Sequence, residues 1–522
     1  MISTCIHHAR VACPEGIRRV NVCIEDGRIA GLVSDDGVDA AINVEAQGLL
    51  LLPGFVDMHR HADLAPFQSA PSIELPQGIT TQVSGNCGFS PAPNTPGTFD
   101  ALRAYAAPIL GDMPEVLRGY DMPAFLRAAS ARPLAVNTGY FVGNGALRIC
   151  VKGFAPSPCS PYELAHICAL LDDALAQGAL GLSLGLMYAP ECYYGRDELL
   201  AIASVAARHH KPVVCHMRGE GKSVVRSVEE VIDLARQTGA RMHISHLKAA
   251  GRNMWGGAVD EILARIDQAK AQGLQVTFDA YPYAAGSTTL TTLFPPEALS
   301  GGTEALLERL RDPVRRSAIV ASLRRERDDW DNLAATTGLD RIEVADSSVA
   351  GEIGRSIADI AAGYGRDPFD FTAELLLREG GSVTIVEHHM DPADVDKILR
   401  RPECIVVSDA LYSAGGRAHP RKFGAFPRFL RRYVRERPML PLEAAVAKIT
   451  RMPADFLGLH ERGRIAAGYA ADLVLVDWDA LTDRATYEQP HQLPEGIRAV
   501  WVNGKQAFAN GKLLSPDAGM LI

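Results

Sequence analysis

The sequence predicts an α/β protein: a (β/α)8 TIM-like barrel with a small β-sandwich or β-barrel domain formed by both chain termini and an insert before the last barrel strand. Three observations support this fold class. Short apolar segments alternate with amphipathic segments through the middle of the chain, and both chain ends alternate in short β-like runs and turns. One interval between predicted strands is too long for a single helix.

The barrel strands are predicted from short apolar runs at residues 54–57, 80–84, 134–138, 180–184, 213–215, 242–245, 276–278 and 405–408. Amphipathic helices are expected between them, for example over residues 162–177, 197–209 and 225–237. Another apolar run, at residues 383–386, is a candidate extra strand. The sequence therefore leaves a count of eight or nine strands open.

The two chain ends differ in rhythm from the middle, which predicts the domain division. Residues 1–51 and 458–522 are expected to form the small β domain together. Residues 52–457 are expected to form the barrel, with an inserted subdomain at about residues 290–375.

Composition narrows the functional classes. The chain has 522 residues, is 47% hydrophobic and carries a formal net charge of −9, so a large core is expected and nucleic acid is not an expected partner. It has no secretory signal pattern and no run of about 18 apolar residues, so we expect a cytoplasmic protein that does not span a membrane. Its ten cysteines form no CxxC pair, which is typical of buried thiols.

Polar side chains that can bind metals follow the predicted barrel strands at their carboxyl ends, where barrel active sites lie. His59 and His61 end the first strand, and alternate residues of an extended segment share a face. The other candidates are Cys87 after the second strand, His216 after the fifth, His246 after the sixth and Asp409 after the eighth.

Each of these residues alone has an ordinary structural explanation, as a satisfied polar residue or an inert buried thiol. The joint pattern of four histidines, one cysteine and one aspartate at strand ends is specific, and it favours a borderline-soft ion such as zinc. His388 and His389 end the possible extra strand, and a part for them in the site stays open.

Longer motifs show a family resemblance. Residues 53–61 (PGFVDMHRH) and 468–476 (GYAADLVLV) resemble the amidohydrolase superfamily. Residues 78–92 (GITTQVSGNCGFSPA), 245–248 (SHLK), 279–283 (DAYPY) and 419–421 (HPR) resemble its N-acyl-D-amino-acid deacylases, the D-aminoacylases. The resemblance runs from about residue 15 to 510 and is weakest across the insert.

The resemblance implies a ligand set and a reaction. Cys87, His216 and His246 would hold one tightly bound zinc ion, and His59 and His61 would form a second, weaker site. Hydantoinases and dihydroorotases carry a carboxylated lysine on the fourth strand, whereas residues 179–187 (ALGLSLGLM) contain no lysine. The expected reaction is zinc-dependent hydrolysis of the amide bond of N-acyl-D-amino acids, with preference for a D isomer implied by the resemblance alone.

Asp409 is the candidate general base, taking a proton from water that zinc activates, and the resemblance implies that it returns the proton to the leaving amine. A role as metal ligand only is the alternative for Asp409. Arg421 matches the family's carboxylate-binding arginine. Lys248, Tyr188, Tyr281, Tyr283 and Ser287 are further candidates for substrate binding, with an ordinary polar role at the rim as the alternative.

The chain departs from the family where it has Ser408-Asp409-Ala410 and where Glu191 follows Pro190, so the substrate side chain stays open. The expected partner is a small molecule with a free carboxylate, and we lean toward neutral or apolar D-amino acids. Two other functions stay open: hydrolysis of cyclic amides, cyclic imides or dipeptides, and an inactive barrel that only binds metal. The oligomeric state, the acyl group and the role of the insert are not predicted.

Overall fold

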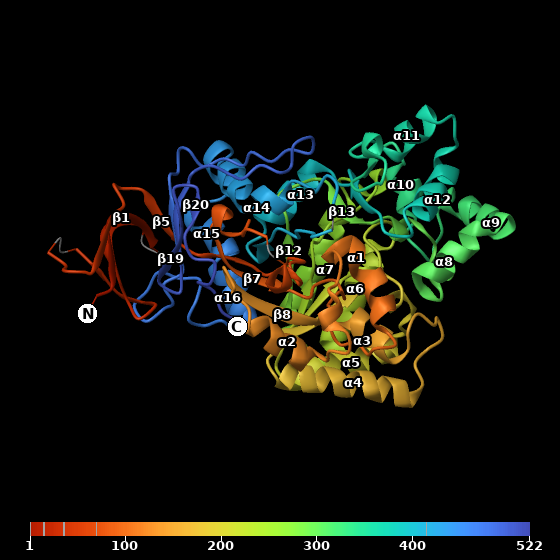
Figure 1. Cartoon of the computed structure of the whole chain (residues 1–522), viewed down its shortest axis with the longest axis horizontal. Helices are drawn as coiled ribbons and strands as arrows, with labels where there is room; N and C mark the ends of the chain where they lie inside the picture. The colour runs from red at the N-terminus through yellow and green to blue at the C-terminus, as the bar shows by residue number, and fades with distance from the viewer. Residues whose placement is uncertain (1, 14–15, 35–36, 69, 414) are drawn as a thin grey trace.

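The computed structural model describes residues 2–13, 16–34, 37–68, 70–413 and 415–522, and its centre is a parallel barrel (Figure 1). Eight strands follow the order β16-β12-β11-β10-β9-β8-β7-β6, and all neighbours are parallel. They are β6 (Phe55–Asp57), β7 (Ile79–Ser84), β8 (Asn137–Gly143), β9 (Gly181–Gly185), β10 (Val213–His216), β11 (Met242–Ile244), β12 (Val276–Ala280) and β16 (Cys404–Val406). The predicted barrel is confirmed.

One strand lies further along the chain than predicted. The expected run at residues 134–138 precedes most of β8, which covers Asn137–Gly143. The carbonyl of Leu134 accepts a hydrogen bond from the backbone of Gly519 at 2.7 Å, so the start of this run contacts the C-terminal segment, whereas Asn137 and Thr138 belong to β8 and pair with β7.

The barrel closes just beyond the ends of β6 and β16, the two strands at the ends of the sheet order. The backbone amide of Asp409 donates to the carbonyl of His59 at 2.9 Å, and the amide of His61 donates to the carbonyl of Ala410 at 3.0 Å. The closure therefore fixes the backbone of three candidate site residues directly.

Helices surround the barrel and connect its strands. They are α1 (Phe99–Leu110), α2 (Met122–Ser130), α3 (Asn144–Val151), α4 (Pro161–Ala176), α5 (Arg196–Arg208), α6 (Val224–Thr238), α7 (Ala258–Ala271), α13 (Pro392–Arg400), α14 (Arg421–Leu430), α15 (Leu442–Ile449) and α16 (Arg451–Leu457). The start of α4 shows why its sequence is helical, because Ser160 and Glu163 cap each other's backbone amides ahead of Pro161. None of the helices in the described ranges combines the length and apolar character needed to cross a bilayer.

Both chain ends form one sheet of nine strands beside the barrel. Its strands are β1 (Thr4–Cys13), β2 (Gly16–Glu25), β3 (Arg28–Val33), β4 (Ile42–Glu45), β5 (Leu50–Pro53), β17 (Leu473–Val476), β18 (Ile497–Val502), β19 (Lys505–Ala509) and β20 (Lys512–Leu513). The two ends meet where β5 pairs antiparallel with β17, Leu51 opposite Leu475. The red and blue strands lie side by side at one end of the molecule in Figure 1.

Most of the long segment between β12 and β16 builds a separate layer, whose helices lie at the end of the molecule away from the terminal sheet (Figure 1). It contains a small antiparallel sheet, in the order β13-β15-β14, and several helices. Its elements are β13 (Gly286–Thr289), α8 (Gly302–Arg311), α9 (Pro313–Leu323), α10 (Leu333–Thr337), β14 (Ile342–Val344), α11 (Ile357–Gly363), α12 (Pro368–Arg378) and β15 (Thr384–Glu387).

The candidate extra strand at residues 383–386 corresponds to β15, which belongs to this small sheet and not to the barrel. The helices of the layer share an apolar core of their own that includes Leu306, Leu333, Phe371 and Ile385. We call the sheet of β13, β14 and β15 with α8 to α12 the insert layer.

Candidate metal centre and active site

The six predicted metal ligands come together in the mouth of the barrel, each at or just beyond the carboxyl end of a strand. His59 and His61 follow β6, Cys87 follows β7, His216 ends β10, His246 follows β11 and Asp409 follows β16. All six are buried, with exposed fractions of 0 to 5%. They come together because parallel strands end at the same rim of a barrel, and their role as metal ligands stays a prediction.

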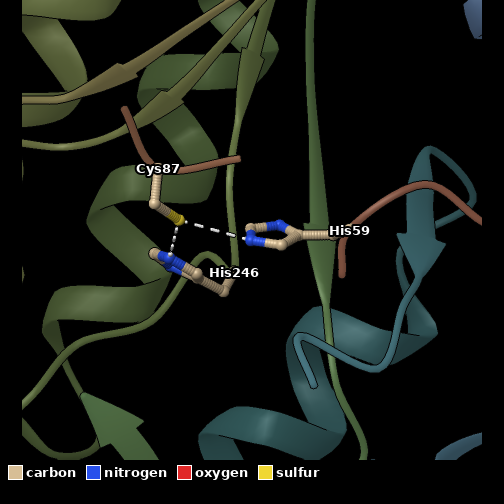
Figure 2. A group of neighbouring side chains, drawn as sticks. All are labelled: His59, Cys87 and His246. Carbon is tan, nitrogen blue, oxygen red and sulfur yellow. Dashed lines mark hydrogen bonds between the residues drawn. The ribbon is translucent and has the colours of Figure 1, made fainter. Parts of the chain in front are cut away.

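Cys87 lies between two imidazole rings. Its Sγ is 3.3 Å from Nε2 of His59 and 3.5 Å from Nε2 of His246, and Figure 2 shows both rings directed at the sulfur. Burial raises the pKa of the thiol, but His59 and His246 outweigh it and hold that pKa well below its usual range. The lowered pKa favours the thiolate, which is the form that binds metals.

Asp409 contacts both histidines that follow β6 and the guanidinium of Arg421. Its Oδ1 lies 3.4 Å from Nε2 of both His59 and His61, and its Oδ2 lies 2.9 Å from Nη2 of Arg421. Burial raises the pKa of this carboxyl, yet Arg421 and the neighbouring histidines bring it well below the ordinary value. Asp409 is therefore ionised and can accept a proton.

His216 stands beside His246, with ring centroids 4.4 Å apart. Neither of its ring nitrogens has a hydrogen-bond partner among the described residues, although both are buried. Its Nε2 is 4.0 Å from Oε1 of Glu220. Buried imidazole nitrogens of this kind normally find a partner, so the orphaned ring points to a ligand.

Two carboxylates that were not predicted from the sequence contact the histidine rings on the side away from Cys87. Asp279 accepts from Nδ1 of His59 at 3.2 Å and from Nε2 of His243 at 3.0 Å. Glu220 lies 3.0 Å from Nδ1 of His246. In both rings the nitrogen facing away from the carboxylate is the one that faces Cys87, as in carboxylate–histidine–metal arrangements. The spacing of His216 and Glu220 in one loop was the available signal for the second carboxylate.

The backbone at three of these residues is strained. Cys87, His246 and Asp409 have φ angles of 54°, 37° and 49°, in the left-handed region that residues other than glycine rarely adopt. Each follows the end of a barrel strand and turns its side chain toward the same point. Strain of this kind costs on the order of 1–3 kcal/mol per residue and is concentrated at functional sites.

Arg421, at the start of α14, is a buried cation beside the metal ligands, with an exposed fraction of 1%. Its guanidinium lies 4.5 Å from the ring centroid of Tyr281, and Nη2 also donates to the backbone oxygen of Ser287 at 3.2 Å. Its Nε and Nη1 have no hydrogen-bond partner among the described residues. Two free donors on one guanidinium suit a carboxylate.

Lys248 is already paired. Its Nζ donates to Oε1 of Glu220 at 2.6 Å and lies 2.8 Å from Nδ1 of His246. The ammonium therefore supplies positive charge next to a metal-ligand candidate while its closest contacts are within the protein.

The remaining substrate-binding candidates differ in where they lie. Tyr188 and Tyr281 line the cavity above the metal ligands, as does Ser287. The Tyr188 hydroxyl lies 3.0 Å from Oγ1 of Thr288, and the Ser287 hydroxyl donates to the carbonyl of Ile385 at 2.8 Å. Tyr283 is outside the set of residues that line this cavity.

The ring of Tyr283 packs against Arg428, whose guanidinium is 4.6 Å from the ring centroid, and against His419 at 5.1 Å. Of the two tyrosines in residues 281–283, Tyr281 is thus the one that faces the metal ligands. The sequence could not separate them because the pair lies in a turn, beyond the regular alternation of β12.

Most of these residues line one cavity. The metal ligands and Arg421 line one wall, and Gly286, Ser287, Glu387 and His389 from the insert layer line the other. The two histidines at residues 388 and 389 therefore lie in different environments. His389 reaches the cavity, whereas Nε2 of His388 lies 3.0 Å from Glu343 on β14.

The residues present fit a zinc ion. A thiolate, imidazole nitrogens without protein partners and an ionised carboxylate converge within one buried rim, and this is the donor set that zinc prefers. Three groups of three side chains bring their ligand atoms within 4.8 Å of one another: His59, Cys87 and His246; His59, His61 and Asp409; and His216, Glu220 and His246. How two ions would divide these ligands stays a prediction.

A family model described as "Amidohydrolase family" matches residues 43–508. The chain belongs to the amidohydrolase family. Among curated proteins it is 35% identical to the N-acyl-D-glutamate deacylase of Alcaligenes xylosoxydans xylosoxydans, over 96% of this chain and 94% of that protein. It is 31% identical to the D-aminoacylase of the same organism, over 97% of this chain and 94% of that protein.

Solved structures give the same result. The crystal structure of N-acyl-D-glutamate deacylase from Bordetella bronchiseptica, complexed with zinc and a phosphonate mimic of the tetrahedral intermediate, superposes with a TM-score of 0.84 at 32% identity, covering 100% of this chain and 99% of that one. L-Hydantoinase from Arthrobacter aurescens, at 15% identity and a TM-score of 0.56, shares the fold. The resemblance of this amidohydrolase to the N-acyl-D-amino-acid deacylases is thereby confirmed.

Proposed function

We propose that this chain hydrolyses the amide bond of N-acyl-D-amino acids, giving a carboxylate and a free D-amino acid, in a zinc-dependent reaction. One observation carries the proposal: Arg421, a buried cation with two free donors, lies in one cavity with the thiolate and imidazole ligands. An α-carboxylate bound there places the adjacent amide at the metal centre. The relatives named as N-acyl-D-glutamate deacylase and D-aminoacylase support the same substrate class.

The ligands for zinc would be Cys87, His59, His61, His216, His246 and Asp409. A bound zinc ion supplies a nucleophile from water near neutral pH and polarises the amide carbonyl. No lysine lies on β9, the fourth strand of the barrel, and Cys87 offers the thiolate in place of a carboxylated lysine.

The protein side chains transfer the proton, orient the substrate and exclude water. Asp409 takes a proton from water at a carboxylate oxygen and returns it to the leaving amine, because it is ionised and lies within 3.4 Å of two ligand histidines. Arg421 and Tyr281 orient the α-carboxylate of the substrate, while Lys248 pairs with Glu220 next to His246. Burial of the whole rim excludes bulk water, which strengthens each of these interactions.

The test is amine release from matched D and L pairs of N-acetyl-methionine, N-acetyl-phenylalanine and N-acetyl-glutamate, with protein whose zinc content has been measured. We expect turnover of D isomers only. Turnover of L isomers at equal rates would refute the stereochemical part. No turnover of either series, nor of N-acetyl-D-lysine and N-acetyl-D-arginine, with zinc present would refute the deacylase function and favour cyclic amides, cyclic imides or dipeptides.

A further inference from the structure

Two buried polar residues of the insert layer face the metal centre and have no part in the reaction described above. Glu387 ends β15 and His389 follows two residues later; their exposed fractions are 2% and 3%. Both line the cavity that holds Arg421 and the metal ligands. They come from the segment that contains the insert layer, whereas the strained residues follow barrel strands.

The polar atoms of this pair are largely without partners. Nδ1 of His389 lies 3.3 Å from Oε2 of Glu387, which is the only ion-pair contact of Glu387 among the described residues. Oε1 of Glu387 and Nε2 of His389 have no hydrogen-bond partner there. Leaving a buried carboxylate oxygen without a donor costs free energy, so a site of this kind is normally completed by a ligand.

The charges around the pair identify the missing partner. Lys248 is neutralised by Glu220 at 2.6 Å, and Arg421 by Asp409 at 2.9 Å. Glu387 is therefore the carboxylate of this cavity that has no lysine or arginine partner within the described ranges, and its one ion-pair contact is with a histidine. A ligand cation or a strong hydrogen-bond donor would satisfy it, whereas a second carboxylate would be repelled.

The pair lies next to the proposed carboxylate clamp. Gly286 of β13 pairs with Glu387 of β15, and the following residue, Ser287, accepts a hydrogen bond from Arg421. A Cβ placed on Gly286 would lie 3.0 Å from the His389 ring and 3.3 Å from the hydroxyl of Tyr281. Because Gly286 has no side chain, the clamp and the Glu387–His389 pair come within reach of one small molecule.

We propose that Glu387, supported by His389, binds the side chain of the substrate and selects N-acyl-D-amino acids whose side chain carries an ammonium or guanidinium group. This subsite rests on the proposed deacylase function and replaces our expectation from the sequence of a neutral or apolar side chain. The side-chain cation donates to Oε1 of Glu387, while Arg421 holds the α-carboxylate. N-acyl-D-lysine and N-acyl-D-arginine are substrates with this chemistry.

The test compares kcat/KM for N-acetyl-D-lysine, N-acetyl-D-arginine, N-acetyl-D-norleucine and N-acetyl-D-glutamate, using the zinc-quantified full chain. Norleucine has the four-carbon side chain of lysine without the terminal ammonium group. We expect the two cationic substrates to exceed norleucine by at least about tenfold, since hydrogen bonds to charged groups are worth roughly that factor or more. A preference for glutamate or norleucine over lysine would overturn the proposal.

Variants localise the effect. Glu387→Gln keeps the shape and removes the charge, so it is expected to lower kcat/KM for the lysine and arginine substrates about 30-fold, mainly through KM, and for norleucine less than threefold. Glu343→Gln is the matched control, because Glu343 lies on the adjacent strand β14 and contacts His388 outside the cavity. An equal loss on all substrates with Glu387→Gln would contradict a side-chain subsite.

Binding of the free products separates this proposal from the deacylase function. Calorimetry on the zinc-loaded protein is expected to show D-lysine binding at least about tenfold more tightly than D-norleucine, and Glu387→Gln is expected to abolish that difference. If no N-acyl-D-amino acid is turned over but this difference is present, the deacylase function fails and the subsite stands. If deacylation occurs and the difference is absent, the subsite fails alone.

Discussion

The two walls of the cavity are built on different principles. On the barrel wall, Cys87, His246 and Asp409 hold strained backbone conformations, and carboxylates such as Asp279 fix the ligand rings from behind. On the insert wall, Glu387 carries a buried polar atom that no described residue satisfies.

This difference suggests that the barrel wall carries out the reaction and the insert wall selects the substrate. A wall whose side chains are held in place by other protein groups cannot adapt to a substrate, and this rigidity suits a reaction centre that must be preorganised. The unpartnered atoms of the barrel wall, on His216 and Arg421, suit zinc and the α-carboxylate that every substrate shares, whereas the unpartnered oxygen of Glu387 suits a group that differs between substrates. We therefore expect substitutions on the barrel wall to affect all substrates equally, and those on the insert wall to change substrate ratios.

The largest expected effect is that of Asp409→Asn. The amide keeps the size of the side chain but cannot take a proton, so kcat should fall on the order of 10³-fold on every N-acyl-D-amino acid. Activity is measured as amine release by protein whose zinc content equals that of the wild type. Full activity with zinc bound would refute the acid–base role, and loss of zinc would instead identify Asp409 as a ligand.

Asp279→Asn tests the support behind the barrel wall. The carboxylate contacts two histidine rings, and loss of its charge should weaken zinc binding about 10- to 100-fold by releasing the orientation of His59. Competition with a chelator measures the affinity. Asp483→Asn is the control, since that buried carboxylate pairs only with Arg428 and Arg431 among the described residues. Unchanged zinc affinity in Asp279→Asn would contradict the supporting role.

The sequence predicted the barrel wall well because its residues follow a repeating rule. Each ligand comes at the end of an apolar strand, and parallel strands end at one rim, so eight local patterns suffice to bring six side chains together. The support from Asp279 was not predictable in this way. Its contact with His59 joins residues 220 positions apart, and only the closed barrel brings them into contact.

The residues of the insert wall could not be predicted from the sequence for a different reason. The run at residues 383–386 is apolar like a barrel strand, and nothing local shows that β15 pairs with β13 and β14 instead. The side that Glu387 faces depends on that pairing. His389 was a candidate without a role, and the three-dimensional position of its ring against Gly286 was needed to place it in the cavity.

Arg421→Lys examines the residue that connects the two walls, since its guanidinium contacts both Asp409 and the Ser287 carbonyl. A lysine keeps the charge but loses the fork of donors, so KM should rise about 10- to 100-fold for all side chains alike. Steady-state kinetics on lysine and norleucine substrates measures this. Arg428→Lys, on the same helix but outside the cavity, should change KM less than threefold. A loss confined to one substrate would place Arg421 in the side-chain subsite instead.

The smallest expected effects distinguish the two tyrosines of residues 281–283. Tyr281→Phe should raise KM about tenfold at most, because its hydroxyl lies in the cavity beside the guanidinium that binds the carboxylate. Tyr283→Phe should leave KM within threefold, since Tyr283 does not line the cavity. The Tyr283 hydroxyl is buried without a hydrogen-bond partner in the described part of the chain, so its removal should not lower the melting temperature. The reverse order of the two KM changes would mean that Tyr283, and not Tyr281, meets the substrate, and the proposed position of the α-carboxylate would have to move toward His419.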